Sequence, residues 1–180
     1  GSALCTPEQT AEIAEKLGLE VIKPVSYKTD NGIVISSTKI RNALSEGNID
    51  EANAMLGYPY QLYGVVISGN RLGHTIGFPT ANMQLYEPLK LVPGNGVYLV
   101  KVETLGRQWD GMCNIGVRPT LGSGNALTIE TNIFDFDEDI YGLDIRLSFV
   151  KKIRNEVKFN DLALLTSQLD KDRELCRSLL

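Results

Sequence analysis

The pattern of apolar and polar positions changes near residue 58 of this chain. Before it, apolar residues recur at helical spacing and predict three short helices: one over residues 7–17, one from Ser36 or Ser37 to Gly47, and one over 49–56. Residues that favour helix starts precede these segments, and glycines follow them. Residues 19–27 are predicted to form a strand. The first third of the chain is therefore expected to be a short α/β fragment.

After residue 58, segments rich in β-branched and aromatic residues alternate with glycine-containing turns. Strands are predicted at residues 62–68, 97–103, 108–115, 127–136 and 144–152. Short strands at this spacing are typical of an antiparallel barrel, which closes its own edges. A final helix is predicted from a cap at Asn160, because apolar residues between Leu162 and Leu179 recur at helical spacing. That apolar stripe should pack on the barrel.

The composition narrows the class of protein. The 180 residues carry 18 Lys and Arg against 22 Asp and Glu, so the net charge is −4. A polyanion-binding surface needs clustered basic residues, which argues against a nucleic-acid partner. Cys5, Cys113 and Cys176 are too scattered for a disulfide framework or a zinc site. No apolar run approaches the roughly 20 residues of a membrane span. We expect a cytoplasmic protein with no membrane partner.

The most informative segment is GFPTAN at residues 77–82, which follows a loop that contains Gly69 and Gly73. A glycine-rich loop can present backbone N–H groups to an anion, because glycine adopts positive φ and has no side chain. In an extended segment the Thr80 and Asn82 side chains share one face, and both offer the hard oxygen ligands that Mg²⁺ accepts beside water and phosphate. The segment indicates a Mg-nucleotide site, although a surface turn that enters a strand has the same spacing.

Four motifs, in order, carry a resemblance to a known family. They are GFPTAN at 77–82, GVY at 96–98, NIGVRPT at 114–120, and ETNIFDF at 130–136 with YG at 141–142. With these motifs, residues 60 to 180 resemble the riboflavin kinase family, the ATP-dependent enzymes that make FMN. The resemblance implies a six-stranded antiparallel Greek-key barrel with a C-terminal helix, which agrees with the mainly β pattern of this part of the chain.

The first third has a resemblance of its own. The segment ISSTKIR at residues 35–41 is similar to a motif near the end of the FMN adenylyltransferase module, which precedes the kinase in bacterial bifunctional FAD-synthesising proteins. This resemblance implies an adenylyltransferase fragment at 1–58 and a riboflavin kinase domain at 59–180. In such a module Ser37, Thr38 and Arg41 would bind ATP phosphates at a helix N-terminus. The chain has one histidine and no HxGH-type motif, so adenylyltransferase activity is expected to be absent from it.

The riboflavin kinase resemblance implies transfer of the ATP γ-phosphoryl group to the riboflavin 5′-hydroxyl, with ATP, Mg²⁺ and riboflavin as small-molecule partners and FMN as product. Glu130 is the expected general base, because a carboxylate within hydrogen-bond reach can accept the hydroxyl proton. Thr80 and Asn82 are expected to hold the metal. The predicted nucleotide-binding residues are Gly69, Arg71, Gly73, Gly77, Pro79, Thr80, Asn82, Val97, Tyr98 and Asn114. The predicted flavin-binding residues are Glu130, Phe134, Tyr141 and Arg173.

Two positions depart from the family pattern. Asn132 stands where the family often has a histidine, so no proton-handling role is assigned to it. His74 stands where the family commonly has arginine and is interpreted as a loop residue. The acidic residues between Asp135 and Asp139 invite a calcium interpretation, but the segment lacks the glycine and glutamate of an EF-hand loop. A solvated turn is predicted there instead.

Other functions fit parts of the same pattern. A barrel that binds flavin or nucleotide without turnover would use the same pocket but would not need Glu130 at the reacting hydroxyl. An oligonucleotide-binding barrel would need a more basic and aromatic surface. Flavin binding with and without Mg-nucleotide separates an enzyme from a binding module, because a kinase is expected to close over both ligands and couple them.

Overall fold

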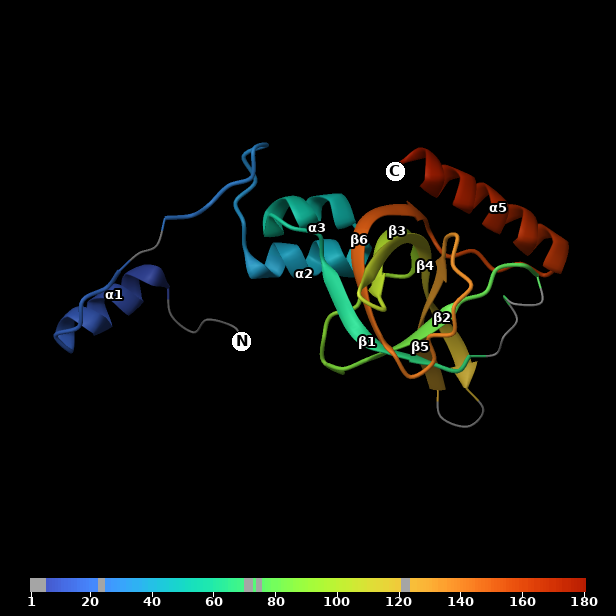
Figure 1. Cartoon of the computed structure of the whole chain (residues 1–180). Coiled ribbons are helices and arrows are strands. Elements are labelled where there is room, and N and C mark those ends of the chain that lie inside the picture. Colours follow the sequence, from blue (N-terminus) through green and yellow to red (C-terminus); the bar gives the residue numbers. More distant parts are fainter. Residues whose placement is uncertain (1–5, 23–24, 70–72, 74–75, 121–123) are drawn as a thin grey trace. The chain divides into compact units, whose positions relative to one another are not determined.

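Figure 1 shows a computed structural model of the whole chain. The structure describes residues 6–22, 25–69, 73, 76–120 and 124–180. The chain divides into two compact units, Gly1–Val34 and Ile35–Leu180. Each unit is described by itself below.

The first unit contains helix α1, Pro7–Lys16. Its start confirms the predicted cap, because the Thr6 hydroxyl accepts from the Gln9 N–H while the Gln9 side chain accepts from the Thr6 N–H. The strand predicted over 19–27 is wrong for its described residues, which have no regular structure. The described part of this unit offers only an isolated bridge between Lys28 and Val34, and a strand with no neighbour leaves its backbone groups unpaired.

The second unit is built around a closed antiparallel barrel. Its described strands are β1 Gln61–Ile67, β2 Ala81–Leu85, β3 Gly96–Thr104, β4 Arg107–Thr120, β5 Gly124–Ile133 and β6 Asp144–Arg154. They are hydrogen-bonded in the order β1-β2-β5-β4-β3-β6, and β6 pairs with β1 to close the ring. The predicted mainly β barrel with a C-terminal helix is confirmed. The five predicted strands are present, and the pattern did not single out the five-residue β2.

Period-two alternation gives each barrel strand two different faces. On β3, Tyr98 points into the barrel and packs edge-to-face on Phe149 of β6, with ring centroids 5.4 Å apart. Its neighbours Val97 and Leu99 point outward, yet they are also buried. Side chains on the outer face of β3 and β4 must therefore be covered by something other than the barrel.

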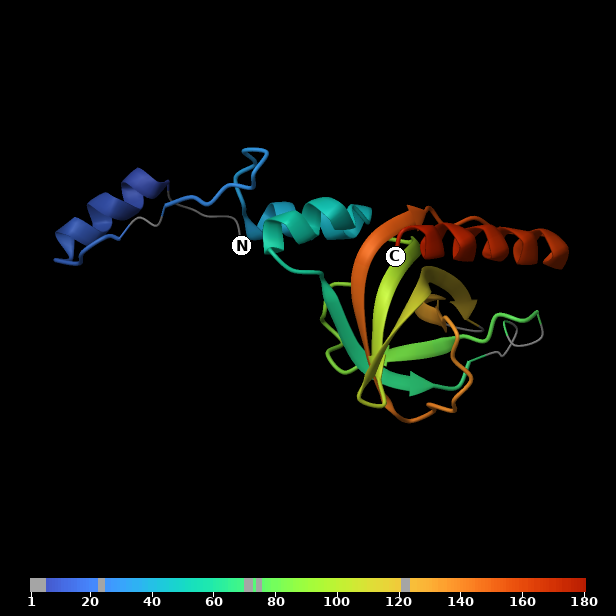
Figure 2. The same cartoon turned by 45° about the horizontal axis from the view of Figure 1, so that its top comes forward.

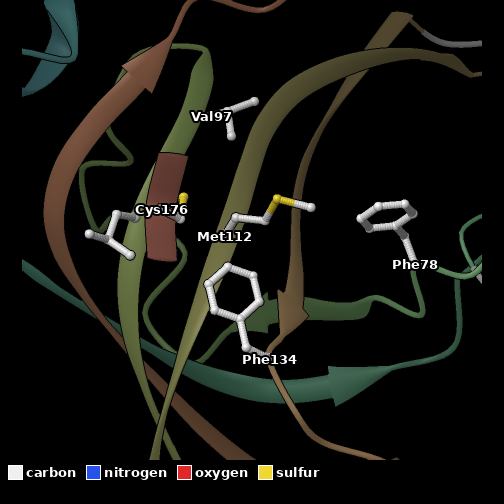
Figure 3. Packing of buried hydrophobic residues seen from close by; sticks show 6 residues of the cluster. Phe78, Val97, Met112, Phe134 and Cys176 are labelled. Carbon is white, nitrogen blue, oxygen red and sulfur yellow. The ribbon is translucent and has the colours of Figure 1, made fainter. Parts of the chain in front are cut away.

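Helix α5, Leu162–Ser178, provides that cover. It lies alongside the barrel in both views (Figures 1 and 2) and contacts β4 and β6. A cluster of buried side chains fills the interface (Figure 3): Phe78, Val97, Leu99, Met112, Phe134 and Cys176. The helix is capped by the Asp161 carboxylate, which accepts from the Ala163 N–H, and not by the predicted Asn160. The predicted packing of an apolar stripe on the barrel is confirmed for Leu169 and Cys176, whereas Leu162 and Leu179 at the two ends of the stripe are exposed.

An ion pair fixes α5 to the last strand. The Arg154 guanidinium donates to both carboxylate oxygens of Asp172. The Oδ2 atom is 2.8 Å from Nε and 2.7 Å from Nη2. The Gln168 amide donates to the same carboxylate at 2.8 Å. Only 3% of the Asp172 side chain and 19% of the Arg154 side chain are exposed. The helix is therefore held at a defined position on the strand by a nearly dry charged contact.

Helices α2, Ser37–Glu46, and α3, Ile49–Leu56, belong to the same compact unit as the barrel. Both end at glycines in the left-handed conformation, Gly47 and Gly57, as the sequence predicts. The Asn53 amide of α3 donates to the Phe149 carbonyl of β6 at 2.9 Å. The domain boundary predicted between residues 58 and 59 is based on sequence resemblance, whereas the second compact unit of the structure begins at Ile35.

Candidate active site

The GFPTAN segment forms a tight turn that leads into strand β2. Gly77 has φ +79°, a conformation that glycine adopts without strain. The Phe78 N–H then donates to the Gly73 carbonyl at 2.8 Å, which closes the turn. A Cβ on Gly73 would come within 3.0 Å of the Phe78 carbonyl oxygen, and one on Gly69 would come equally close to the Asn82 amide. Glycine is required at both positions because the space for a side chain is occupied by the Phe78 backbone at Gly73 and by the Asn82 side chain at Gly69.

Strand pairing brings the polar residues of three motifs into one row. Strand β5 lies between β2 and β4, so Glu130 is opposite Asn82 on one side and opposite Asn114 on the other. Asn132 follows two residues later on the same face of β5. Residues that are 48 positions apart in the chain thus become neighbours, and the half-buried Glu130 side chain is at their centre.

A cavity of about 200 Å³ opens over this row. Its walls are apolar on the side of α5 and polar on the side of β5, and the residues that line it are Gly73, Ile76, Phe78, Thr80, Asn82, Val97, Met112, Asn114, Glu130, Asn132, Arg154, Glu156, Val157, Phe159, Leu165 and Leu169. We call this the helix-side cavity. A narrow apolar slot with a carboxylate at one end suits a flat apolar ligand that carries a hydroxyl.

A second cavity, of about 350 Å³, lies against the opposite face of β5. We call it the barrel-side cavity; it is lined by Val66, Pro79, Thr80, Ala81, Thr131, Ile133, Phe136, Asp137, Glu138, Asp139, Ile140 and Tyr141. Of the residues that line the two cavities, Thr80 lines both. The threonine of the GFPTAN segment therefore borders both cavities.

The structure unites most of the predicted site residues, but it divides them between the cavities. Gly73, Asn82, Val97, Asn114 and Glu130 line the helix-side cavity. Pro79 and Tyr141 line the barrel-side cavity, and Thr80 lines both. Gly69 contacts the Asn82 side chain, Gly77 belongs to the turn, and Arg71 lies outside the described residues.

Three predicted binding residues lie away from both cavities. Tyr98 points into the barrel, where its hydroxyl donates to the Gly94 carbonyl. Phe134 is buried in the cluster beneath α5, with the Arg177 guanidinium 5.2 Å from its ring centroid. Arg173 stacks over Phe78 at 4.7 Å and pairs with Asp170 at 2.6 Å. The structure shows these side chains in contacts within the protein, and their ligand contacts stay predictions.

Several lining residues were not singled out by the sequence. Leu165 and Leu169 belong to the predicted apolar stripe of the last helix, but periodicity alone cannot show that part of a stripe borders a cavity. Arg154 is the last residue of β6, Glu156 lies just after the strand, and neither belongs to a motif. The Asn95 amide donates to the Glu156 carboxylate at 3.1 Å, so this second carboxylate of the helix-side cavity is held in place.

The charges around the site have identifiable partners. A hydrogen bond from Arg177, supported by the charges of Arg177 and Arg173, holds the pKa of the Asp135 carboxyl below its usual value. Burial raises the pKa of the Cys113 thiol, which lies on the inward face of β4, to about 12, so it stays protonated at neutral pH. Neither group is poised for proton transfer in this site.

The donor set fits a magnesium ion that keeps water and phosphate as further ligands. Thr80 and Asn82 offer a hydroxyl and a carbonyl oxygen, and Glu130 lies opposite Asn82. Within the part of the chain that the structure describes, no three His, Cys, Asp or Glu side chains gather as a complete metal site. No helix among the described residues has the length and apolar character to cross a membrane.

Comparison with known proteins identifies the family. Residues 56–180 match the Flavokinase model, described as riboflavin kinase. Two proteins named bifunctional riboflavin kinase/FMN adenylyltransferase are similar to the chain. The Bacillus subtilis protein is 45% identical over 83% of this chain and 48% of its own length, and the Escherichia coli K12 protein is 38% identical over 92% and 53%. The chain thus spans about half the length of these relatives.

A solved structure supports the fold. A crystal structure described as a macrolide-efflux protein from Streptococcus pneumoniae matches with a TM-score of 0.81 and 37% identity, over 94% of this chain and 55% of that one. Its description names another activity, whereas the family model and the two bacterial relatives agree with each other. Because the family model covers more than half of the residues, this chain belongs to the riboflavin kinase family.

Proposed function

We propose that this chain is a riboflavin kinase, which transfers the γ-phosphoryl group of ATP to the riboflavin 5′-hydroxyl and releases FMN and ADP. The observation that carries the proposal is the arrangement of Thr80 and Glu130. The Glu130 carboxylate lines one cavity, and Thr80 of the GFPTAN segment lines both that cavity and a second one. Phosphoryl transfer needs two bound substrates that meet at one point, together with a group that accepts a proton.

Riboflavin is assigned to the helix-side cavity. The general base must lie within hydrogen-bond reach of the reacting hydroxyl, and Glu130 lines this cavity. The wall formed by Phe159, Leu165 and Leu169 offers apolar surface to the flat isoalloxazine ring. The ribityl chain then extends from the α5 side toward Thr80.

ATP is assigned to the barrel-side cavity, with its γ-phosphate at Thr80. Phe136, Ile140 and Tyr141 offer apolar and aromatic surface to the base. This assignment changes several expectations from the sequence. Gly73, Asn82, Val97 and Asn114, expected to bind the nucleotide, border the proposed flavin cavity, and Tyr141, expected to bind flavin, becomes part of the nucleotide wall.

The reaction steps follow from the chain's own groups. Glu130 accepts the proton of the 5′-hydroxyl as its oxygen forms a bond to the γ-phosphorus and the bond to ADP breaks. Thr80 and Asn82 would hold Mg²⁺, which supplies charge neutralisation at the phosphates when it is bound.

A product assay tests the proposal. The chain is incubated with riboflavin, ATP and Mg²⁺, and riboflavin, FMN and FAD are separated by chromatography. We expect FMN without FAD, no FMN when EDTA removes Mg²⁺, and a decrease of about 10²- to 10⁴-fold in kcat for Glu130→Gln. Glu174→Gln on the exposed side of α5 is the matched control and should retain full activity. Riboflavin binding without any FMN would instead identify a binding module.

A second experiment tests the assignment of the two cavities with matched aromatic truncations. Phe159→Ala removes a ring from the helix-side cavity, and Tyr141→Ala removes one from the barrel-side cavity. We expect the first variant to raise KM for riboflavin by about tenfold with little change for ATP, and the second to do the reverse, since each ring contributes on the order of 1 kcal/mol of contact. The opposite pattern of KM changes would show that the assignment is inverted.

A further inference from the structure

Asn132 makes a contact that the proposed chemistry does not use. Its side-chain amide Nδ2 donates to the backbone carbonyl of Pro79 at 2.8 Å. Asn132 is buried, with 7% of its surface exposed, and it lies two residues after Glu130 on the same face of β5. The bond therefore joins the strand of the general base to the residue immediately before Thr80.

The contact has a clear origin in strand pairing. The β2–β5 register pairs Ala81 with Thr131 and Asn82 with Glu130, so its continuation would place Thr80 opposite Asn132. The backbone ladder cannot continue normally toward Pro79, because proline has no N–H to donate. The Pro79 carbonyl still needs a donor where regular pairing ends, and the Asn132 side chain provides it, so a carbonyl that would be costly to leave unpaired is satisfied.

We propose that Asn132 is a positioning residue that fixes Thr80 relative to Glu130 through this bond to Pro79. The inference rests on the proposed kinase function, in which phosphoryl transfer occurs between these two side chains. Without the bond the Pro79–Thr80 peptide loses a side-chain hydrogen bond and keeps the pairing of Ala81 with Thr131 and the turn that contains Gly77. A displacement of about 1 Å between reacting groups can lower a rate about a hundredfold.

The role requires a donor at residue 132, and not merely a polar side chain. Asn132→Asp keeps the shape but places a carboxylate that cannot donate against the Pro79 carbonyl, and Asn132→Leu keeps the approximate size without polarity. Asn132→His retains an N–H and should rescue part of the function. We expect kcat/KM for MgATP to fall about thirtyfold in the Asp and Leu variants, and less than about fivefold in the His variant.

A double-mutant cycle separates positioning from a general structural role. If Asn132 acts through Thr80, then Asn132→Leu should lower kcat/KM by less than about threefold in a Thr80→Ala background. Asn53→Asp is the matched control, because it also removes a side-chain donor from a backbone carbonyl, that of Phe149, at a distance from Thr80. It should lower the melting temperature without changing kcat/KM. An equal effect of Asn132→Leu in both backgrounds would overturn the inference.

Hydrogen–deuterium exchange tests the same contact without turnover. Asn132→Leu should increase exchange in peptides that span residues 78–82 and leave the β3–β4 hairpin unchanged, whereas Asn53→Asp should not affect 78–82. Unchanged exchange at 78–82 in Asn132→Leu would overturn the positioning role whatever the activity. If the unaltered chain makes no FMN while this exchange difference is present, the proposed function fails and the structural role of Asn132 remains.

Discussion

The ion pair between Arg154 and Asp172 yields a prediction whose magnitude follows from burial. In Asp172→Asn the guanidinium remains where it is but loses its counter-charge. Removing one partner of a buried ion pair costs about 3–5 kcal/mol, because an uncompensated charge is left in a poorly solvated place. Since 19% of the Arg154 side chain is exposed, we expect the lower end, about 3 kcal/mol.

That cost should be visible in thermal unfolding. For a chain of 180 residues, each kcal/mol shifts the melting temperature by about 2–4 °C, so Asp172→Asn should lower it by about 6–12 °C. Asp170→Asn on the same helix is the control. Asp170 pairs with Arg173, but 47% and 37% of these side chains are exposed, and exposed pairs contribute at most about 1 kcal/mol.

A double variant tests the cause of the loss. In Arg154→Met/Asp172→Leu both charges are replaced by apolar groups, so no unpaired charge remains, and a buried pair replaced in this way is often neutral for stability. We therefore expect the double variant to be more stable than Asp172→Asn. If it is instead less stable, the pair contributes net attraction and our account of the magnitude is wrong. Equal losses in Asp170→Asn and Asp172→Asn would also refute the reasoning.

Two further predictions concern the turn and the thiols. Gly73→Ala should raise KM for ATP at least about tenfold in steady-state kinetics. The added Cβ would meet the main-chain oxygen of Phe78, which cannot move aside as a side chain would. A wild-type KM for ATP would contradict this prediction. In a Cys5→Ser variant at pH 8, Cys113 and Cys176 should not react with a thiol reagent until the protein is denatured. Burial raises the pKa of both thiols to about 12, so neither forms the reactive thiolate. Labelling of either cysteine in the native protein would contradict this prediction.

The sequence predicts the barrel well because strand alternation and turns are local properties. The β3–β4 hairpin is an example: the predicted turn is observed, with positive φ at both Leu105 and Gly106, which suits the twist of the strands it joins. The strand predicted over 19–27 fails for the opposite reason. Its apolar residues favour an extended segment, but a strand also needs a neighbour, and no local pattern supplies one.

The candidate site could be predicted only in part because its geometry depends on non-local register. The motifs identify Thr80, Asn82 and Glu130, yet nothing in the sequence states that Asn82 pairs with Glu130. Alternation along one strand is local, so the sequence does indicate that the adjacent Val97 and Tyr98 side chains point to opposite faces. The structure places Val97 on the helix side and Tyr98 inside the barrel.

The same alternation lets one strand border two cavities. On β5, Glu130 and Asn132 line the helix-side cavity, while Thr131 and Ile133 line the barrel-side cavity. In the proposed function the strand thus separates the flavin and ATP spaces, and Thr80 borders both. A one-residue slip of β5 would exchange its two faces and place the carboxylate on the nucleotide side. Asn132 donates to Pro79 at the point where the pairing of β5 with β2 ends. In this proposal the same residue therefore maintains both the strand register and the geometry of the reacting groups.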